Sequence, residues 1–219
     1  MFVPRAGTYP GVGYLFADRA EAGELLAERL LFARDPVVLA LPRGGVAVGE
    51  PVARRLGGAL EVLVTRKIGY PPAPELGVGA IAEGGEPVFD LELLRKLGMT
   101  PESVAWVVEQ ERAELARRVA VYRGERALPD LTGREVIVVD DGLATGGTAR
   151  AALRVVAGLE PGRVTLAVPV GARETVRALR AEADEVVALA TPVDFRAVGQ
   201  WYERFGQLSD ADVLRLLGR

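Results

Sequence analysis

The sequence contains no histidine and no cysteine among its 219 residues. Without histidine the chain cannot form a Ser-His-Asp triad, an imidazole acid or base, or a histidine zinc site. Without cysteine it has no disulfide, no thiolate nucleophile and no cysteine-ligated metal. Any chemistry must therefore use carboxylates, arginine, lysine, hydroxyls, backbone groups or an external ion.

Long apolar runs are also missing, and lysine is scarce. No run reaches the roughly 18 apolar residues that a membrane-spanning helix needs. The first residues lack the apolar core of a signal peptide, so we expect a cytoplasmic protein with no membrane partner. Lysine occurs only at Lys67 and Lys96, and the formal net charge is −3. This balance gives no basic field, so we expect no nucleic-acid partner.

Short β-branched apolar runs alternate with helical patterns along most of the chain. Strands are predicted at residues 36–42, 60–65, 133–142, 163–168 and 185–190, and helices at 19–32, 46–56, 100–119, 146–158, 172–181 and after Ser209. This order predicts an α/β fold with a mostly parallel, Rossmann-like sheet flanked by helices. Because ligands bind at the carboxyl ends of such strands, the loops after Leu41, Thr65, Val139 and Ala190 should converge on one site.

Residues 69–87 interrupt this alternation. Glycine and proline fill nine of these nineteen positions. Long segments of this composition inside compact domains are commonly functional loops, so an irregular loop is predicted here.

The segment from Asp140 to Thr148 carries the most chemical information. Asp140 and Asp141 end an apolar strand, and ionised carboxylates accept hydrogen bonds, which suits the vicinal hydroxyls of a ribose. The loop of Ala144, Thr145, Gly146, Gly147 and Thr148 then leads into a helix. Its glycines free backbone N–H groups, its threonines add hydroxyls, and the helix dipole favours an anion. The segment therefore predicts a site for a ribose 5-phosphate.

This segment resembles the phosphoribosyl-pyrophosphate signature of the type I phosphoribosyltransferases, and its loop looks most like the adenine branch. The resemblance implies that Asp140 and Asp141 hold the ribose hydroxyls and that residues 144–148 bind the 5-phosphate. It also implies a Mg²⁺ ion between pyrophosphate and ribose, which Asp140 and Asp141 contact through water. Hypoxanthine-type members carry an aspartate for proton transfer where this chain has Ala144. That role is absent here or supplied elsewhere, and Glu83 is a candidate acid or base, with a solvated loop carboxylate as the alternative.

Two further segments resemble parts of the same family. Arg43, Gly44 and Gly45 follow the first predicted strand, as the pyrophosphate loop does, although such a sequence is also a common turn. Arg66 and Lys67 offer two cations for the leaving pyrophosphate, or they are solvated surface charges. Residues 66–90 resemble the flexible lid loop that excludes water from the reaction.

The resemblance divides the chain into a core of residues 1–190 and a C-terminal hood of residues 191–219, which residues 1–15 are candidates to join. Hood aromatics such as Phe195, Trp201 and Tyr202 either stack on a base or pack the tail onto the core. The family also implies a homodimer.

The resemblance implies a phosphoribosyltransferase of nucleotide metabolism. It would transfer the 5-phosphoribosyl group of phosphoribosyl pyrophosphate to a small nitrogen-containing acceptor, expected to be a nucleobase, with release of pyrophosphate. One alternative is a non-catalytic regulator of the same fold that keeps the ligand site. A phosphoribosyl-pyrophosphate synthetase fits less well, because it needs an ATP site and usually a longer chain.

Overall fold

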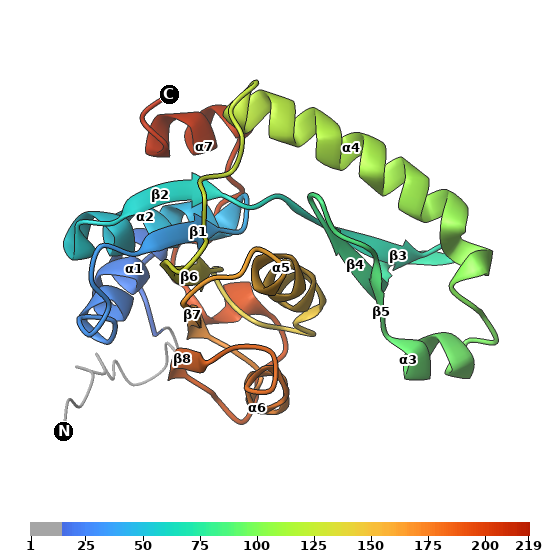
Figure 1. The fold of residues 1–219 in the computed structure, drawn as a ribbon. Helices are drawn as coiled ribbons and strands as arrows, with labels where there is room; N and C mark the ends of the chain where they lie inside the picture. Colours follow the sequence, from blue (N-terminus) through green and yellow to red (C-terminus); the bar gives the residue numbers. More distant parts are fainter. Residues whose placement is uncertain (1–14) are drawn as a thin grey trace.

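The computed structural model describes residues 15–219. The prediction that residues 1–15 join the hood therefore falls, except for residue 15, outside the described residues. The centre of the structure is a five-stranded parallel sheet of order β2-β1-β6-β7-β8 (Figure 1). The strands are β1 (Val37–Ala40), β2 (Ala59–Val62), β6 (Glu135–Val139), β7 (Arg163–Val170) and β8 (Glu185–Ala190). The predicted Rossmann-like α/β fold is therefore confirmed.

Helices cover both faces of this sheet. They are α1 (Arg19–Glu28) and α2 (Gly44–Leu56) on one face, and α5 (Gly147–Ala157) and α6 (Arg173–Leu179) on the other. Successive side chains of a strand point to opposite faces, so Val38 packs toward α1 and α2 while Leu39 packs toward α5 and α6. Burial on both faces explains why β1 reads as a continuous apolar run.

A second, antiparallel sheet corrects the prediction of an irregular loop at residues 69–87. It consists of β3 (Thr65–Tyr70), β4 (Ala73–Ala82) and β5 (Val88–Phe89). Ala80 and Ala82 of β4 pack against Ala151 and Val155 of α5, so small side chains let the sheet lie close to that helix. Glycine and proline do not mark a loop here, because backbone pairing and this packing hold the strands. Movement of the segment as a lid stays a prediction.

The second sheet belongs to an arm, residues 65–123, that extends from the parallel sheet (Figure 1). The arm also contains α3 (Leu91–Lys96), the 3-10 turn η1 (Glu102–Val104) and α4 (Ala105–Arg123). Val78 and Ile81 of β4 pack with Val107 and Leu115 of α4 in an apolar cluster that also includes residues of β1, β2, α2 and α7. The helix at 91–96 was not among the predicted elements.

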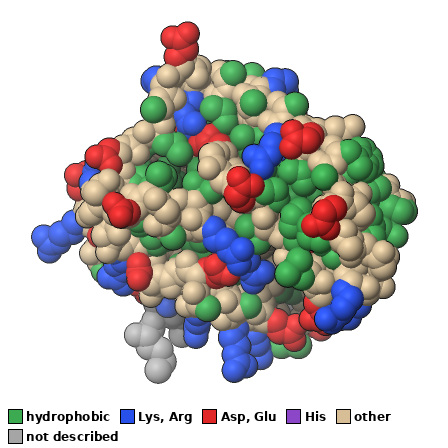
Figure 2. Space-filling view, turned by 45° about the vertical axis from the view of Figure 1, so that its right-hand side comes forward, with side chains coloured by type: hydrophobic (Ala, Val, Ile, Leu, Met, Phe, Trp, Pro, Cys, Tyr) green, Lys and Arg blue, Asp and Glu red, His purple; other side chains and the backbone are tan. Residues whose placement is uncertain are grey.

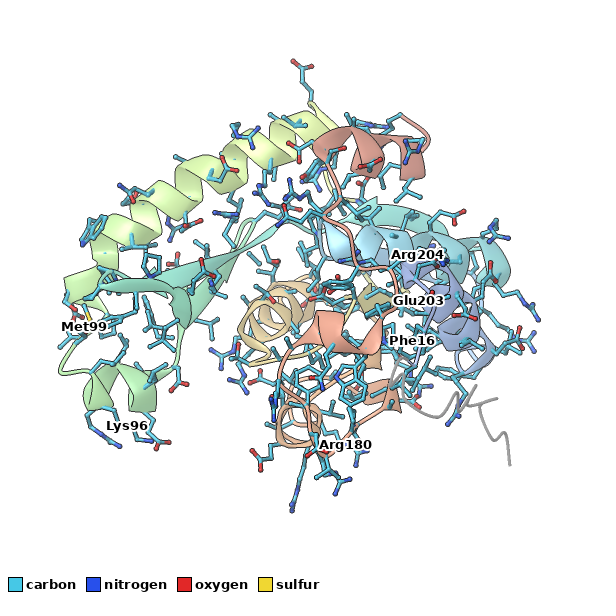
Figure 3. The ribbon with its side chains drawn as sticks, turned by 180° about the vertical axis from the view of Figure 1, so that it is seen from behind. Phe16, Lys96, Met99, Arg180, Glu203 and Arg204 are labelled. Carbon is cyan, nitrogen blue, oxygen red and sulfur yellow. The ribbon has the colours of Figure 1, made fainter. Side chains whose placement is uncertain are left out.

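The C-terminal segment divides into two parts. Residues 191–208, which include η2 (Val198–Trp201), lie beside the start of the described chain; Phe16, Glu203 and Arg204 are neighbours there (Figure 3). The N–H groups of Glu203 and Arg204 donate to the carbonyls of Phe16 and Ala17, both at 2.9 Å. Helix α7 (Asp210–Leu216) instead packs against α2 and α4. Its predicted cap is confirmed as a capping box of Ser209 and Asp212. The predicted hood spanned residues 191–219; because α7 packs elsewhere, hood below refers to residues 191–208 only.

Candidate active site

The loops that follow β1 and β6 meet because these two strands are neighbours in the sheet. A Cβ atom added to Gly44 would lie 2.5 Å from the carboxylate carbon of Asp141, and one on Gly45 would lie 2.6 Å from the carbonyl oxygen of Val139. Only glycine fits at this approach. The structure thus brings the predicted pyrophosphate loop against the predicted ribose-binding pair. The Pro42–Arg43 peptide bond within this loop is cis.

The two acidic side chains have different partners. Asp141 Oδ2 accepts a hydrogen bond from Arg19 Nε at 2.8 Å, and Asp140 Oδ1 accepts one from the Asp141 N–H at 2.8 Å. Burial, together with the neighbouring Asp141 carboxylate, raises the pKa of Asp140 well above its usual range. Burial also raises the pKa of Asp141, and Arg19 opposes this rise. Without ligand, the pair is therefore a costly concentration of negative charge that Arg19 offsets in part.

The predicted phosphate loop is open to solvent and held from behind. Gly146 adopts a left-handed φ of +74° immediately before α5 begins. Thr175 Oγ1 donates to the Ala144 carbonyl at 2.6 Å, while Ala144 and Thr145 are exposed. This fixed turn at the amino end of an eleven-residue helix has the geometry of an anion site.

Arg43 lies at the amino end of α2, and its side chain reaches toward α7. Its Nη1 atom is 3.8 Å from Asp210 Oδ1, and the Tyr122 hydroxyl donates to the same carboxylate. Burial and the Asp210 carboxylate raise the pKa of Tyr122 to about 12. About a third of the Arg43 side chain is exposed, so this weak pair leaves the guanidinium accessible.

Arg66 and Lys67 lie in the arm. Arg66 Nε pairs with Glu111 Oε2 at 2.6 Å, and Lys67 Nζ donates to the Glu75 carbonyl at 2.9 Å. Both line a groove of about 330 Å³ with Trp106. Within residues 15–219, no hydrogen bond or ion pair joins either cation to the acidic pair. Their contact with pyrophosphate stays a prediction.

Glu83 is buried and ion-paired, which contradicts one of its two predicted settings. It forms a two-pronged ion pair with Arg123, at 2.8 and 2.9 Å, and the side chains are only 7% and 6% exposed. The solvated carboxylate is therefore wrong, and the geometry gives an acid or base role no support. Burial raises the pKa of Glu83 against the opposing effect of Arg123. The sequence could not reveal the partner, which is forty residues away.

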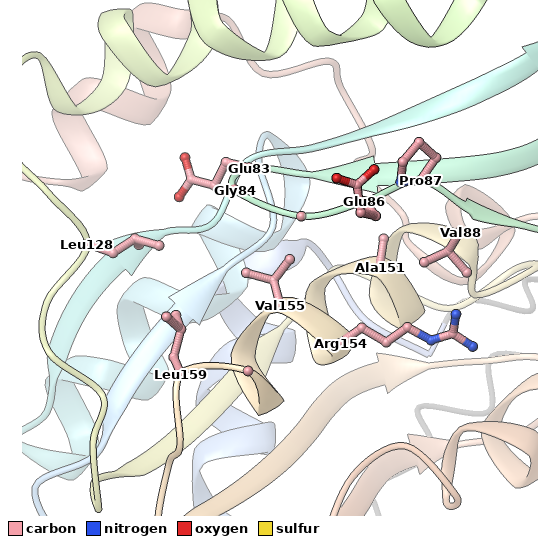
Figure 4. A pocket seen from close by; sticks show the side chains of 12 residues that line it. Glu83, Gly84, Glu86, Pro87, Val88, Leu128, Ala151, Arg154, Val155 and Leu159 are labelled. Carbon is pink, nitrogen blue, oxygen red and sulfur yellow. The ribbon is translucent and has the colours of Figure 1, made fainter. Parts of the chain in front are cut away.

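A cavity of about 400 Å³ lies next to this ion pair, between the turn that joins β4 to β5 and helix α5 (Figure 4). Glu83, Leu128 and Val155 are among its lining residues. Among residues 15–219, Glu83 is the only residue that both lines this cavity and was predicted to belong to the active site. The cavity is therefore separate from the converging loops.

The hood aromatics form a packed cluster beside the acidic pair. Tyr202 is 2% exposed, and its ring centre lies 5.4 Å from that of Phe16 and 5.0 Å from that of Phe205. Its hydroxyl donates to the Asp141 carbonyl at 2.6 Å. Tyr202 was predicted either to stack on a base or to pack the tail onto the core, and its burial fits packing. Phe195 and Trp201 stack on each other at 6.5 Å and stay partly exposed, so they remain candidates for a base.

Arg19 is the site residue that sequence reasoning missed. It stands at the first position of α1, where a cation opposes the helix dipole. This local conflict is a usable signal, because residues that break a local rule often serve a tertiary contact. Its partner Asp141 is 122 positions away, so the sequence could not show the contact.

The residues present can hold a magnesium ion only together with a ligand. No cluster of three or more candidate metal-binding side chains occurs in the part of the chain that the structure describes. Mg²⁺ is commonly bound by one or two carboxylates with phosphate oxygens and water completing the shell. Asp140 and Asp141 match that requirement in number and chemistry.

Charged side chains of both signs lie on the surface (Figure 2). On the face shown in Figure 2, basic and acidic side chains are interspersed, with no continuous basic stripe. Among residues 15–219, no helix combines the length and apolar character needed to cross a membrane.

Comparison with known proteins gives the family. The family model of the phosphoribosyl transferase domain matches residues 18–200. Relatives in two strains of Mycobacterium tuberculosis, each named "Putative phosphoribosyl transferase", are 45% identical over 207 residues, which is 94% of this chain. The match spans 47% of their length, so this chain covers about half of those relatives.

Solved structures agree with this assignment. The crystal structure of TT1426 from Thermus thermophilus is 48% identical, with a TM-score of 0.77, and the match covers 92% of this chain and 97% of that one. A hypothetical protein from Neisseria gonorrhoeae with bound ppGpp, 15% identical with a TM-score of 0.50 over 95% of this chain and 97% of its own, shares the fold. The converging loops, the sheet order and the family match together show that this chain belongs to the phosphoribosyl transferase domain family.

Proposed function

We propose that the protein is a magnesium-dependent phosphoribosyltransferase that uses phosphoribosyl pyrophosphate and a nitrogen nucleophile, with a nucleobase as the expected acceptor. The observation that carries the proposal is the convergence of three loops at one edge of the sheet. The acidic pair after β6 touches the Gly44–Gly45 loop after β1, and the Gly146 turn follows the acidic pair directly.

Each loop matches one part of this donor. The carboxylates of Asp140 and Asp141 would accept hydrogen bonds from the ribose hydroxyls. The turn of residues 144–148 and the amino end of α5 would hold the 5-phosphate. Backbone N–H groups of Gly44 and Gly45, with Arg43, would face the pyrophosphate. When bound, Mg²⁺ supplies charge neutralisation for the leaving pyrophosphate.

The proposed reaction breaks the bond between ribose C1 and pyrophosphate and forms one to the acceptor nitrogen. The leaving group is already activated, so no protein nucleophile is needed, and the lack of histidine and cysteine is no obstacle. The chain's part is to position the donor and stabilise developing charge. The acceptor would lie at the hood side, where Phe195 and Trp201 are partly exposed.

Incubation with phosphoribosyl pyrophosphate, Mg²⁺ and a panel of nucleobases, followed by an assay of pyrophosphate release, tests the proposal. Turnover should depend on Mg²⁺ and on one class of base. Thermal stabilisation by the donor without turnover on any base would instead support the regulator. The panel should also include non-nucleobase amines, because the proposal requires only a nitrogen nucleophile and the nucleobase is an expectation.

A double variant separates the site from the activity. Asp140→Asn with Asp141→Asn should weaken donor binding strongly, whereas Asp194→Asn, an exposed hood carboxylate, should not. Unchanged donor affinity in the double variant would show that the acidic pair is not the ribose site.

A further inference from the structure

Arg19 contacts both the acidic pair and the hood. Its side chain is only 10% exposed, and its Nε donates to Asp141 Oδ2 at 2.8 Å. On its other side, Nη1 donates to the Gly206 carbonyl at 2.9 Å, and the guanidinium carbon lies 3.7 Å from the centre of the Phe205 ring. One buried cation thus joins a proposed donor-binding carboxylate to the loop of residues 205–206.

A second connection runs parallel to the first. The Tyr202 hydroxyl donates to the Asp141 carbonyl at 2.6 Å, and the Tyr202 ring packs on Phe205 with centres 5.0 Å apart. Residues 202–206 are therefore tied to Asp141 through both its carboxylate and its backbone. If Asp141 moves, both its bond to Arg19 and its bond to Tyr202 change, and both of these residues pack on Phe205.

The physical reason for coupling is competition for one carboxylate. A ribose hydroxyl or a hydrated cation that engages Asp141 Oδ2 competes with Arg19 for that oxygen and weakens their hydrogen bond. A buried guanidinium that loses its partner is strongly destabilised, so it must move or strengthen its remaining contacts. Those contacts are the Gly206 carbonyl and the Phe205 ring, both in the hood loop. The free and occupied states of Asp141 thus differ in their contacts with the hood, which is what coupling requires.

We propose that Arg19 is a positioning residue that couples occupancy of the donor site at Asp141 to the position of hood residues 202–206. The identity of the ligands rests on the proposed function, whereas the link between Asp141 and the hood does not. Donor binding would arrange the hood for the acceptor, and acceptor binding would tighten the donor by the same factor.

Trp201 is a natural reporter for the hood. It directly precedes Tyr202, and its buried indole nitrogen has no hydrogen-bond partner among the described residues. The chain has only two tryptophans, and the other, Trp106, is 55% exposed in the arm. A Trp106→Phe background therefore isolates Trp201 for acrylamide quenching.

The first experiment needs no ligand. In the Trp106→Phe background, Arg19→Gln and Asp141→Asn each break the same ion pair, so their effects on Trp201 quenching should be strongly non-additive. Arg204→Gln is the matched control, because Arg204 pairs with Asp18 at 2.7 Å on the same hood but is 63% exposed. The effects of Arg204→Gln and Asp141→Asn on Trp201 quenching should be additive. Additive effects for Arg19→Gln would overturn the proposal. Arg19→Lys, which keeps the charge, should restore part of the coupling and covers the case in which Arg19→Gln does not fold.

The second experiment uses phosphoribosyl pyrophosphate with Mg²⁺ as the probe. Donor saturation should tighten acceptor binding by about tenfold, within the usual range for coupled sites. Arg19→Gln should reduce this factor to about one, whereas Arg204→Gln should keep it. A retained factor in Arg19→Gln would overturn the proposal. If the unaltered protein binds no donor while the ligand-free effects remain non-additive, the proposed function fails and the link between Asp141 and the hood stands.

Discussion

Gly44→Ala is expected to damage the site and the fold together. The added Cβ would lie 2.5 Å from the Asp141 carboxylate carbon and 3.1 Å from Arg19 Nε. Ordinary contact begins at 3.4 Å, and Asp141 Oδ2 would lie even nearer to the new Cβ than the carboxylate carbon does, so the carboxylate must move by more than about 0.9 Å. Such a shift lengthens the 2.8 Å bond to Arg19 Nε beyond hydrogen-bond range if Arg19 stays in place.

The size of the effect follows from the burial of this pair. Overpacking typically costs about 1–3 kcal/mol, and breaking a buried ion pair about 3–5 kcal/mol. Because Arg19 can follow part of the movement, we expect a loss of about 2–4 kcal/mol in the free energy of unfolding. For a chain of this size, that lowers the melting temperature by about 4–16 °C. A similar loss on the donor complex weakens binding by about 30- to 1,000-fold.

Calorimetric melting and titration with phosphoribosyl pyrophosphate and Mg²⁺ measure both quantities. Gly158→Ala is the matched control, because an added Cβ there meets its nearest neighbour at 3.4 Å, at the end of α5. It should leave both quantities nearly unchanged. If Gly44→Ala melts and binds like the control, the close approach of the two loops does not exist in solution and the reasoning is refuted.

Three further predictions concern single side chains. Glu83→Gln should cost about 3–5 kcal/mol in chemical denaturation by breaking its buried ion pair, whereas Glu86→Gln, 91% exposed in its own pair, should cost little; equal effects would contradict the assigned burial. The raised pKa of folded Asp140 means that the folded state binds more protons than the unfolded one, so stability falls as pH rises from about 4 through that pKa. Asp140→Asn should remove the loss of stability that ionisation of Asp140 causes. The variant should therefore melt higher than the unaltered protein at neutral pH but not near a pH of about 4. Curves of melting temperature against pH that have the same shape for both proteins would refute this. Gly146→Ala should weaken ribose 5-phosphate binding in a calorimetric titration, because φ is +74° and the new Cβ would lie 2.5 Å from Thr175 Cγ2; unchanged affinity would show that this turn does not hold the phosphate.

The local pattern of the chain predicts most of the parallel sheet. β1 reads as a buried strand because its residues are apolar and covered on both faces. The turn at Gly146 is equally local, since a left-handed residue before a helix calls for glycine. The capping box at Ser209 depends only on residues three positions apart.

The arm shows where local pattern fails. Glycine and proline at residues 69–87 indicate a loop when each residue is judged alone. The strands form because β3 and β4 pair with each other and because Ala80 and Ala82 reach Ala151 on a distant helix. Such contacts depend on the path of the chain through space, and no window of sequence contains them.

Residue type and order were therefore sufficient for the α/β class, for the position of the acidic pair and of the glycine turn before α5, and for the exclusion of histidine and cysteine chemistry. Tertiary structure alone decided the partners of the charged groups. Arg19 reaches Asp141 across 122 positions, and Arg123 reaches Glu83 across forty. The physical reason is that a charge buried on folding must find an opposite charge in space, wherever the packed chain brings one within hydrogen-bond range.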